Sequence, residues 1–216
     1  MNSQDFDRYA KIKAMKGQIA QTWIDAFEKH ICPGLSPDAR VLDYGFGDGR
    51  YYEFYLRHFE ADNIHGVEPS QIRTQNARKR GWQHAIYLPL HQPLPYADRT
   101  FDFVNMVEVI EHIPAGETVF YLREISRVLK PGAHLLITTP NYPIKRLYDV
   151  LDAVALRQWR RLLDDPTHVT RYNAKRLTHT LTPFFSRIEL SPYKRGRFYR
   201  TNQERHRWHK LLAVCS

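Results

Sequence analysis

The sequence contains few cysteines and no long apolar run. Its two cysteines, Cys32 and Cys215, lie far apart and form no C-x-x-C pair, so neither a disulfide framework nor a zinc site is predicted. No segment approaches the roughly 18–20 consecutive apolar residues that a membrane helix needs. Residues 1–17 are polar throughout, unlike a secretory signal. These absences predict a cytoplasmic protein without a membrane span.

Acidic residues are scarce in the last third of the chain. Residues 1–140 hold 16 Lys/Arg and 17 Asp/Glu, whereas residues 141–216 hold 16 Lys/Arg and 6 Asp/Glu. The net charge of +9 therefore arises from the last third, which favours an anionic partner there. A solvated basic face without a specific ligand explains the same excess equally well.

Internal repeats and low-complexity tracts are also absent, and short apolar segments alternate with helical patterns over much of the chain. At 216 residues, 43% of them apolar, the chain is expected to form one domain. An amphipathic helix is predicted over 8–30. Strands are predicted at 39–44, 63–68, 84–88, 101–107 and 133–139, with helices at 50–59, 70–80 and 116–129. This alternation indicates an α/β fold with a mostly parallel sheet. After residue 140 we expect helices at 144–163 and 173–182 and an antiparallel strand pair within 184–201.

A glycine-rich turn, Asp43-Tyr-Gly-Phe-Gly-Asp-Gly49, follows the first predicted strand. Glycines there allow positive φ and let a ligand approach the backbone, although a turn shaped only for tight packing explains them as well. The nicotinamide fingerprint requires a glycine at the position of Arg50, and no G-K-[ST] follows for a phosphate loop. Glu68 ends the second strand, where an acid can accept hydrogen bonds from both hydroxyls of a ribose.

Five motifs in order give the chain a specific resemblance to one family. They are VLDYGFGDG at 41–49, GVEPS at 66–70, LPYADRTFDFV at 94–104, EVIEHIP at 108–114 and EISRVLKPGAHLLITTPN at 124–141. In these motifs the chain resembles the class I S-adenosylmethionine-dependent methyltransferases, notably the large group that includes ubiquinone-pathway O-methyltransferases. The resemblance covers residues 39–140 and, weakly, 165–182.

The resemblance implies a fold, a cofactor and an activity. The expected fold is a Rossmann-like, doubly wound seven-stranded sheet, mostly parallel with one antiparallel strand. Residues 39–140 would form the cofactor-binding core and 171–216 the substrate-side part, with helical caps over the acceptor site from 1–36 and 141–170. The expected activity is O- or N-methylation of a small or medium-sized acceptor with S-adenosylmethionine as the cofactor.

The resemblance also implies which residues bind the cofactor. Asp43 and the glycine loop would hold its methionine end and Glu68 its ribose, and the residues after Glu68 would flank the adenine. The family usually has an acid four residues before the Leu-Pro of 94–95 that accepts from the adenine amino group, where this chain has Leu90. Either the backbone at 90–91 takes over that role or the adenine is held less tightly. The predicted cofactor-binding residues are Asp43, Gly45, Gly47, Gly49, Glu68, Pro69, Leu90, His91 and Val107.

The segment after the fourth strand, Glu108-Val-Ile-Glu-His112, is expected to face the acceptor. On a helix or turn, positions 108, 111 and 112 would share one side. A hydroxyl acceptor must lose its proton, either to a base or after a bound metal lowers the pKa of the hydroxyl. We predict a metal-free site with His112 and His168 as the catalytic residues.

A second resemblance leaves a metal-assisted alternative open. Small-RNA 2′-O-methyltransferases and some ubiquinone-pathway O-methyltransferases bind a divalent metal through Glu, Glu and His of this stretch, and the small-RNA enzymes add a downstream His. Here the ligands would be Glu108, Glu111, His112 and His168, a set that suits Mn²⁺, Fe²⁺ or Zn²⁺ better than Ca²⁺. The acceptor would then be an RNA or sugar hydroxyl.

Further alternatives concern the partner and the reaction class. Residues 193–210 interleave basic and aromatic side chains, as single-stranded nucleic-acid binders do, but they contain no named RNA-binding motif. We therefore rank nucleic acid below a small anionic or sugar-like acceptor. A nicotinamide-dependent oxidoreductase is disfavoured by Arg50. A cofactor-binding protein without turnover is disfavoured by Asp43, Glu68 and His112.

Overall fold

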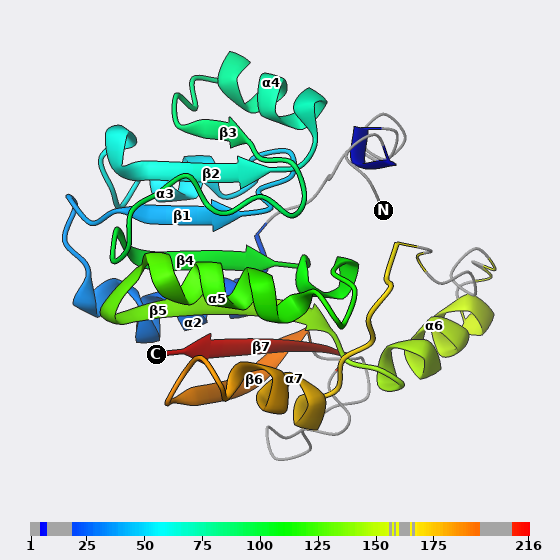
Figure 1. Ribbon diagram of the computed structural model, residues 1–216. Coiled ribbons are helices and arrows are strands. Elements are labelled where there is room, and N and C mark those ends of the chain that lie inside the picture. The colour runs from blue at the N-terminus through cyan, green and yellow to red at the C-terminus, as the bar shows by residue number, and fades with distance from the viewer. Residues whose placement is uncertain are drawn as a thin grey trace.

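Seven strands form one mixed sheet in the computed structural model, which describes residues 5–7, 19–155, 157, 159, 165, 167–194 and 209–216. The strand order is β3-β2-β1-β4-β5-β7-β6. Among the described strands, β7 alone runs in the direction opposite to the other six (Figure 1). The predicted seven-stranded sheet with one antiparallel strand is therefore confirmed. The strands are β1 (Val41–Tyr44), β2 (Ile64–Glu68), β3 (Ala85–Tyr87), β4 (Phe101–Val107), β5 (Leu129–Pro140), β6 (Ile188–Lys194) and β7 (Lys210–Cys215).

Helices cover both faces of this sheet. One buried apolar cluster joins α5 and α7 to the sheet, and a second joins α2 and α3 to its other face. In Figure 1, α5 and α7 lie in front of the sheet and α2 lies behind it. Within the described part of the chain, every helix is too short or too polar to cross a lipid bilayer. The helices are α2 (Gln21–His30), α3 (Tyr52–Tyr55), α4 (Gln71–Lys79), α5 (Thr118–Val128), α6 (Ile144–Ala155) and α7 (Ala174–Leu181), with 3-10 turns η1 (Cys32–Gly34), η2 (Ala61–Asn63) and η3 (Ile110–His112).

The central strands are buried along their whole length because helices cover both of their sides. Every residue of β1 and of β2 is buried. Two of these residues, Asp43 and Glu68, are acidic and lie toward the C-terminal ends of their strands. Burying a carboxylate away from water carries a large free-energy cost unless it is paired. This cost marks that edge of the sheet as a place for a ligand.

Several element boundaries differ from the predictions. β5 begins at Leu129 rather than at 133, because the chain runs directly from the end of α5 into pairing with β4. The antiparallel pair expected within 184–201 consists of β6 and the later β7, which inserts between β5 and β6. The helix expected over 50–59 is limited to α3. Parts of three predicted elements, at 8–18, 160–163 and 195–201, lie outside the described residues.

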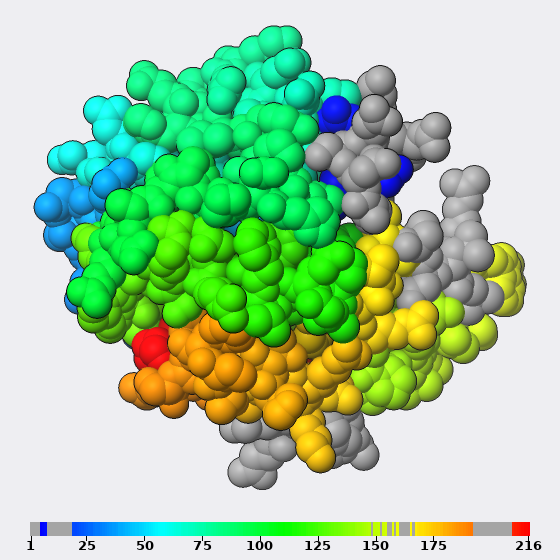
Figure 2. All heavy atoms as spheres, viewed as in Figure 1, coloured from blue at the N-terminus to red at the C-terminus, as the bar shows by residue number. Residues whose placement is uncertain are grey.

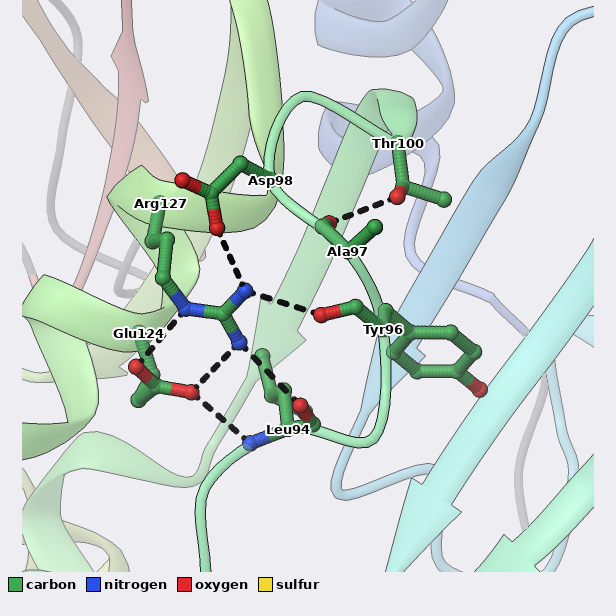
Figure 3. Close-up of polar contacts among 7 residues, drawn as sticks. All are labelled: Leu94, Tyr96, Ala97, Asp98, Thr100, Glu124 and Arg127. Carbon is green, nitrogen blue, oxygen red and sulfur yellow. Dashed lines mark hydrogen bonds and ion pairs between the residues drawn. The ribbon is translucent and has the colours of Figure 1, made fainter.

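Arg127 on α5 holds the loop that leads into β4. Its guanidinium donates to both carboxylate oxygens of Glu124 (2.9 and 2.7 Å) and to Asp98 (2.9 Å). It also donates to the backbone carbonyls of Leu94 and Tyr96 (3.1 and 2.8 Å), and Glu124 accepts from the N–H of Leu94 (2.9 Å), as Figure 3 shows. Arg127 and Glu124 thus hold the backbone of the loop before β4 through charge-assisted hydrogen bonds, which are stronger than neutral ones.

Replacing Arg127 with alanine is expected to lower the free energy of unfolding by about 2–3 kcal/mol, because hydrogen bonds to charged groups contribute about 1.5–3 kcal/mol. For a chain of this size the melting temperature should fall by about 4–12 °C. Thermal unfolding followed by circular dichroism measures the change. Arg123→Ala is the matched control, since Arg123 is exposed on the same helix, and it should shift the free energy by less than about 0.5 kcal/mol. Equal shifts in the two variants would show that the loop does not depend on Arg127.

Candidate active site

The glycine turn after β1 requires glycine for its backbone and for its packing. Gly45, Gly47 and Gly49 have positive φ values of 74°, 59° and 74°, a region that other residues rarely adopt. A Cβ on Gly45 would also lie 2.6 Å from Cγ2 of Val109, which is far inside normal contact distance. Any side chain at position 45 would therefore collide with Val109, which lies in the segment after β4.

Asp43 points a buried carboxylate at the same edge of the sheet. Its Oδ1 accepts a hydrogen bond from the side-chain amide of Asn105 (3.1 Å), whose oxygen in turn accepts from the indole N–H of Trp23 (3.0 Å). Its Oδ2 is buried and has no hydrogen-bond partner among the described residues. Burial raises the pKa of Asp43 to about 7, against the opposing effects of Asn105 and of the charge on Arg50. The unpaired oxygen makes Asp43 an acceptor for a cationic ligand group.

Glu68 links the end of β2 to the glycine turn. Its carboxylate accepts from the backbone N–H of Gly47 (2.9 Å) and of Ser70 (3.2 Å). Burial raises the pKa of Glu68 to about 7, although the Arg73 guanidinium and these hydrogen bonds oppose the shift. Because β1 and β2 are adjacent parallel strands with Asp43 opposite Gly66, the two carboxylates lie at the same end of the sheet.

The other residues predicted to bind the cofactor differ in burial. Pro69 is half-buried and Val107 is buried at the end of β4. Leu90 is half-buried, whereas His91 is exposed, with a left-handed φ of 62°. The N–H of His91 donates to the hydroxyl of Tyr121 (3.2 Å). This N–H is therefore already engaged within the protein. The role of the backbone at 90–91 in holding the adenine stays a prediction.

A second group of polar side chains lies beyond β4 and β5. Ligand atoms of Glu111, His112 and His168 lie within 4.8 Å of one another, and the two imidazole rings are 5.0 Å apart between centroids. Glu111 is fully buried; its Oε2 accepts from the hydroxyl of Thr139 (3.1 Å), while its Oε1 has no hydrogen-bond partner among the described residues. Burial raises the pKa of Glu111 well above its usual value, and the charge of Glu108 adds to the effect. Burial therefore favours the protonated form of Glu111.

The two histidines are oriented by different partners. Nδ1 of His112 lies 3.0 Å from the carbonyl oxygen of Thr167. Because a carbonyl only accepts, Nδ1 carries a proton, and in the neutral ring the lone pair is on Nε2. Nδ1 of His168 lies 2.9 Å from the hydroxyl of Tyr142. Burial and the neighbouring His112 lower the pKa of His168 to about 4. A neutral imidazole can accept a proton from an acceptor hydroxyl or amine.

Glu108 does not join this group. Its φ of 57° turns the backbone out of the helical path, so the expected alignment of positions 108, 111 and 112 on one side of a helix does not form. Its carboxylate accepts from the Lys210 ammonium and from the Thr138 hydroxyl. Burial opposes ionisation of Glu108, but the charge of Lys210 and the hydrogen bonds from Lys210 and Thr138 together outweigh this effect and lower the pKa of Glu108. Of the four residues considered as metal ligands, the structure brings together three.

Comparison with known proteins assigns the family. A family model described as a methyltransferase domain matches residues 14–183, which is most of the chain. The protein belongs to the methyltransferase domain family. Its family implies S-adenosylmethionine as the cofactor and leaves the nicotinamide alternative without support.

Two relatives of this chain are named as N-methyltransferases. It is 32% identical over 112 residues to a glycine/sarcosine/dimethylglycine N-methyltransferase of Actinopolyspora halophila, covering 49% of this chain and 19% of the relative. It is 35% identical over 133 residues to a sarcosine/dimethylglycine N-methyltransferase of Halorhodospira halochloris, covering 56% and 46%. The matches therefore span less than half the length of these relatives, and they do not determine the acceptor.

Solved structures extend the likeness over the whole fold. A chain from the Haloferax volcanii complex of the Trm112 methyltransferase activator with a methyltransferase aligns with a TM-score of 0.67 at 19% identity, covering 99% of this chain and 96% of that one. A Thermotoga maritima S-adenosylmethionine-dependent methyltransferase aligns with a TM-score of 0.64 at 19% identity, covering 98% of both chains. At these identities the likeness shows the fold.

The chemistry of the two buried carboxylates is compatible with the cofactor that the family implies. S-adenosylmethionine carries an α-ammonium group and two ribose hydroxyls. The unpaired Oδ2 of Asp43 suits the ammonium, and the carboxylate of Glu68 has acceptor capacity for the hydroxyls beyond its two backbone hydrogen bonds. The positive φ angles of the glycine turn suit a backbone against which a ligand packs.

Cofactor affinity should depend on pH because both carboxyls have pKa values raised to about 7. Below pH 7 the free protein holds these protons, and a cationic ligand favours the ionised form, so binding releases protons and weakens as pH falls. Ionisation of Asp43 alone should make the affinity fall about 20-fold between pH 7.5 and 5.5, and any ionisation of Glu68 on binding adds to that fall. Titration calorimetry in buffers of different ionisation heat should detect proton release near pH 6. Asp43→Asn should flatten the dependence, and a flat profile in the wild type would contradict the assignment.

Several contacts around the site could not be predicted from local sequence motifs. Lys210 contacts Glu108 across 102 positions, and Tyr142 contacts His168 across 26. Ser70 donates to Asp7, near the N-terminus (2.6 Å). Each pair depends on how distant segments meet at the end of the sheet, which no local motif encodes.

Proposed function

We propose that the protein transfers the methyl group of S-adenosylmethionine to a hydroxyl or amine of a small or medium-sized acceptor. The observation that carries the proposal is the arrangement of two polar groups along one edge of the sheet. Asp43 and Glu68 lie at the ends of β1 and β2, and His112 and His168 lie beyond β4 and β5. Cofactor and acceptor would thus occupy neighbouring positions.

The residues on the acceptor side supply a proton route. When bound, the cofactor provides an electrophilic methyl group on a sulfonium, and the acceptor oxygen or nitrogen attacks it in line. Nε2 of His112 takes the proton that the acceptor loses, and the hydrogen bond from Nδ1 to the Thr167 carbonyl holds the ring in the tautomer this requires. His168 and Tyr142 orient the acceptor. Residues 1–36 and 141–170 are proposed as the cap that excludes water.

A panel of acceptors tests the proposal. The protein is incubated with S-adenosylmethionine and with amines and hydroxyl compounds, beginning with sarcosine and dimethylglycine because two relatives carry those names. Formation of S-adenosylhomocysteine is followed by mass spectrometry. Turnover should require an acceptor and should be lost in Asp43→Ala. Undiminished turnover in that variant, or failure of the wild type to bind the cofactor, would contradict the proposal.

A metal-assisted reaction on an RNA or sugar hydroxyl is the second candidate, because ligand atoms of Glu111, His112 and His168 converge. The pairing of Glu108 with Lys210 removes the fourth expected ligand from that group. The metal-free proposal expects activity to persist in EDTA. Loss of activity in EDTA with recovery in Mn²⁺ would instead establish the metal-assisted reaction.

A further inference from the structure

Helix α6 presents its apolar side to solvent. Leu147, Val150, Leu151 and Val154 are 56%, 43%, 40% and 60% exposed, and their spacing of i, i+3, i+4 and i+7 places them on one face of the helix. Ala153, on another face, is fully buried. A surface helix normally buries its apolar stripe against the core, so this stripe, which we call the α6 stripe, indicates a docking surface.

Basic residues flank the α6 stripe at both of its ends. Arg146 lies one turn before Val150 and also contacts Asp149 (3.4 Å), and the exposed Arg157 lies three positions after Val154. Trp159, just beyond, is 61% exposed. In the sequence, residues 144–161 contain five Lys/Arg and two Asp/Glu. The surface therefore combines apolar area with positive charge and an exposed tryptophan.

We infer that the α6 stripe binds an anionic phospholipid surface. Helices that lie in the membrane interface combine a face of Leu, Val or Trp with flanking Lys or Arg, and tryptophan is enriched at the headgroup level. The excess of basic residues after position 140 adds a long-range attraction to anionic lipid. Membrane binding does not depend on the proposed methyl transfer.

Charge argues against a second copy of this chain as the occupant. In a symmetric pair each α6 stripe would lie on its own counterpart. A parallel pair would place Arg146 beside Arg146, and an antiparallel pair would place Arg146 beside Arg157. Both arrangements bring like charges together, which is unfavourable at an interface. An anionic bilayer instead attracts both ends of the stripe.

Binding at this surface would also orient the active site. α6 follows β5 directly after the segment that contains Tyr142, the partner of His168. In Figure 1, α6 (yellow-green) projects beyond the end of the sheet at which β1 to β5 finish, and in Figure 2 yellow-green atoms lie at the same side of the molecule. The acceptor side would then lie near the bilayer.

Vesicle flotation with the full-length protein tests the inference. Vesicles of phosphatidylcholine alone are compared with vesicles that contain about 30% phosphatidylglycerol, a composition chosen for its surface charge. We expect binding to the anionic vesicles, weaker binding at high salt, and little binding to the neutral ones. The double variant Leu147→Glu/Val154→Glu should bind the anionic vesicles at least about tenfold more weakly, because it removes apolar area and adds negative charge.

The matched control is Val119→Glu, which alters an equally exposed valine (50%) on α5 and should bind like the wild type. Both variants change exposed side chains, and their melting temperatures should match the wild type. The Trp159 emission should shift to the blue on anionic vesicles, and Trp159→Phe should lose that shift. Binding that is absent, equal for both vesicle types, or unchanged in the double variant would overturn the inference. So would a dimer that the double variant abolishes.

Discussion

Replacing Asp43 with alanine is expected to weaken S-adenosylmethionine binding by about 100-fold or more while the fold is retained. The change removes the only acceptor oxygen of Asp43 that lacks a partner among the described residues, and losing a hydrogen bond to a charged group costs about 1.5–3 kcal/mol before the loss of ionic attraction. Asp43→Asn tests the charge alone, because an amide oxygen can still accept from Asn105. Isothermal titration measures both affinities.

The matched control removes a carboxylate from the opposite end of the sheet. Asp102 lies near the start of β4 and pairs with Lys130 (2.7 Å). Asp102→Asn is expected to leave cofactor affinity within about twofold of the wild type, because Asp102 lies at the end of the sheet away from Asp43. If the two asparagine variants lost affinity equally, the loss would reflect general destabilisation rather than the position of Asp43.

Local patterns predict the four parallel strands that precede β5 well. β1, β2 and β3 begin and end within two residues of the predicted segments, and β4 matches at both ends. α4 also follows its prediction, because Ser70 caps its N-terminus by accepting from the N–H of Arg73 and the chain turns at Gly81. These elements are determined by nearby residues.

The features that local sequence patterns did not predict depend on pairing between segments that are distant in the chain. The second strand of the terminal antiparallel pair lies at 210–215 because β7 inserts between β5 and β6, a placement that depends on two distant partners. The same insertion brings Lys210 to Glu108. Motif spacing placed Glu108 with His112 on one helical side, but the left-handed φ of Glu108 depends on contacts with β5 and β7. By contrast, the sequence pattern located the strands that contain Asp43 and Glu68 and the strand that His112 follows.

Replacing His112 with alanine is expected to lower kcat by about 100–10,000-fold, the range for loss of a general base, while S-adenosylmethionine affinity stays within about twofold of the wild type. The physical reason is its tautomer: with Nδ1 donating to the Thr167 carbonyl, Nε2 is the atom that can accept the acceptor proton. Steady-state kinetics with an identified acceptor and titration of the cofactor measure the two quantities separately. His179→Ala changes an exposed histidine on α7 and should leave both unchanged.

Comparison with His168→Ala assigns the two histidines. His168 is hydrogen-bonded to Tyr142, and as an orienting residue its loss should raise the acceptor KM more than it lowers kcat. The opposite outcome, a large fall in kcat for His168→Ala and a small one for His112→Ala, would transfer the role of base to His168. In that case kcat should fall only as the pH approaches about 4, where the imidazole of His168 becomes protonated. Equal losses that EDTA reproduces in the wild type would assign both rings to a metal.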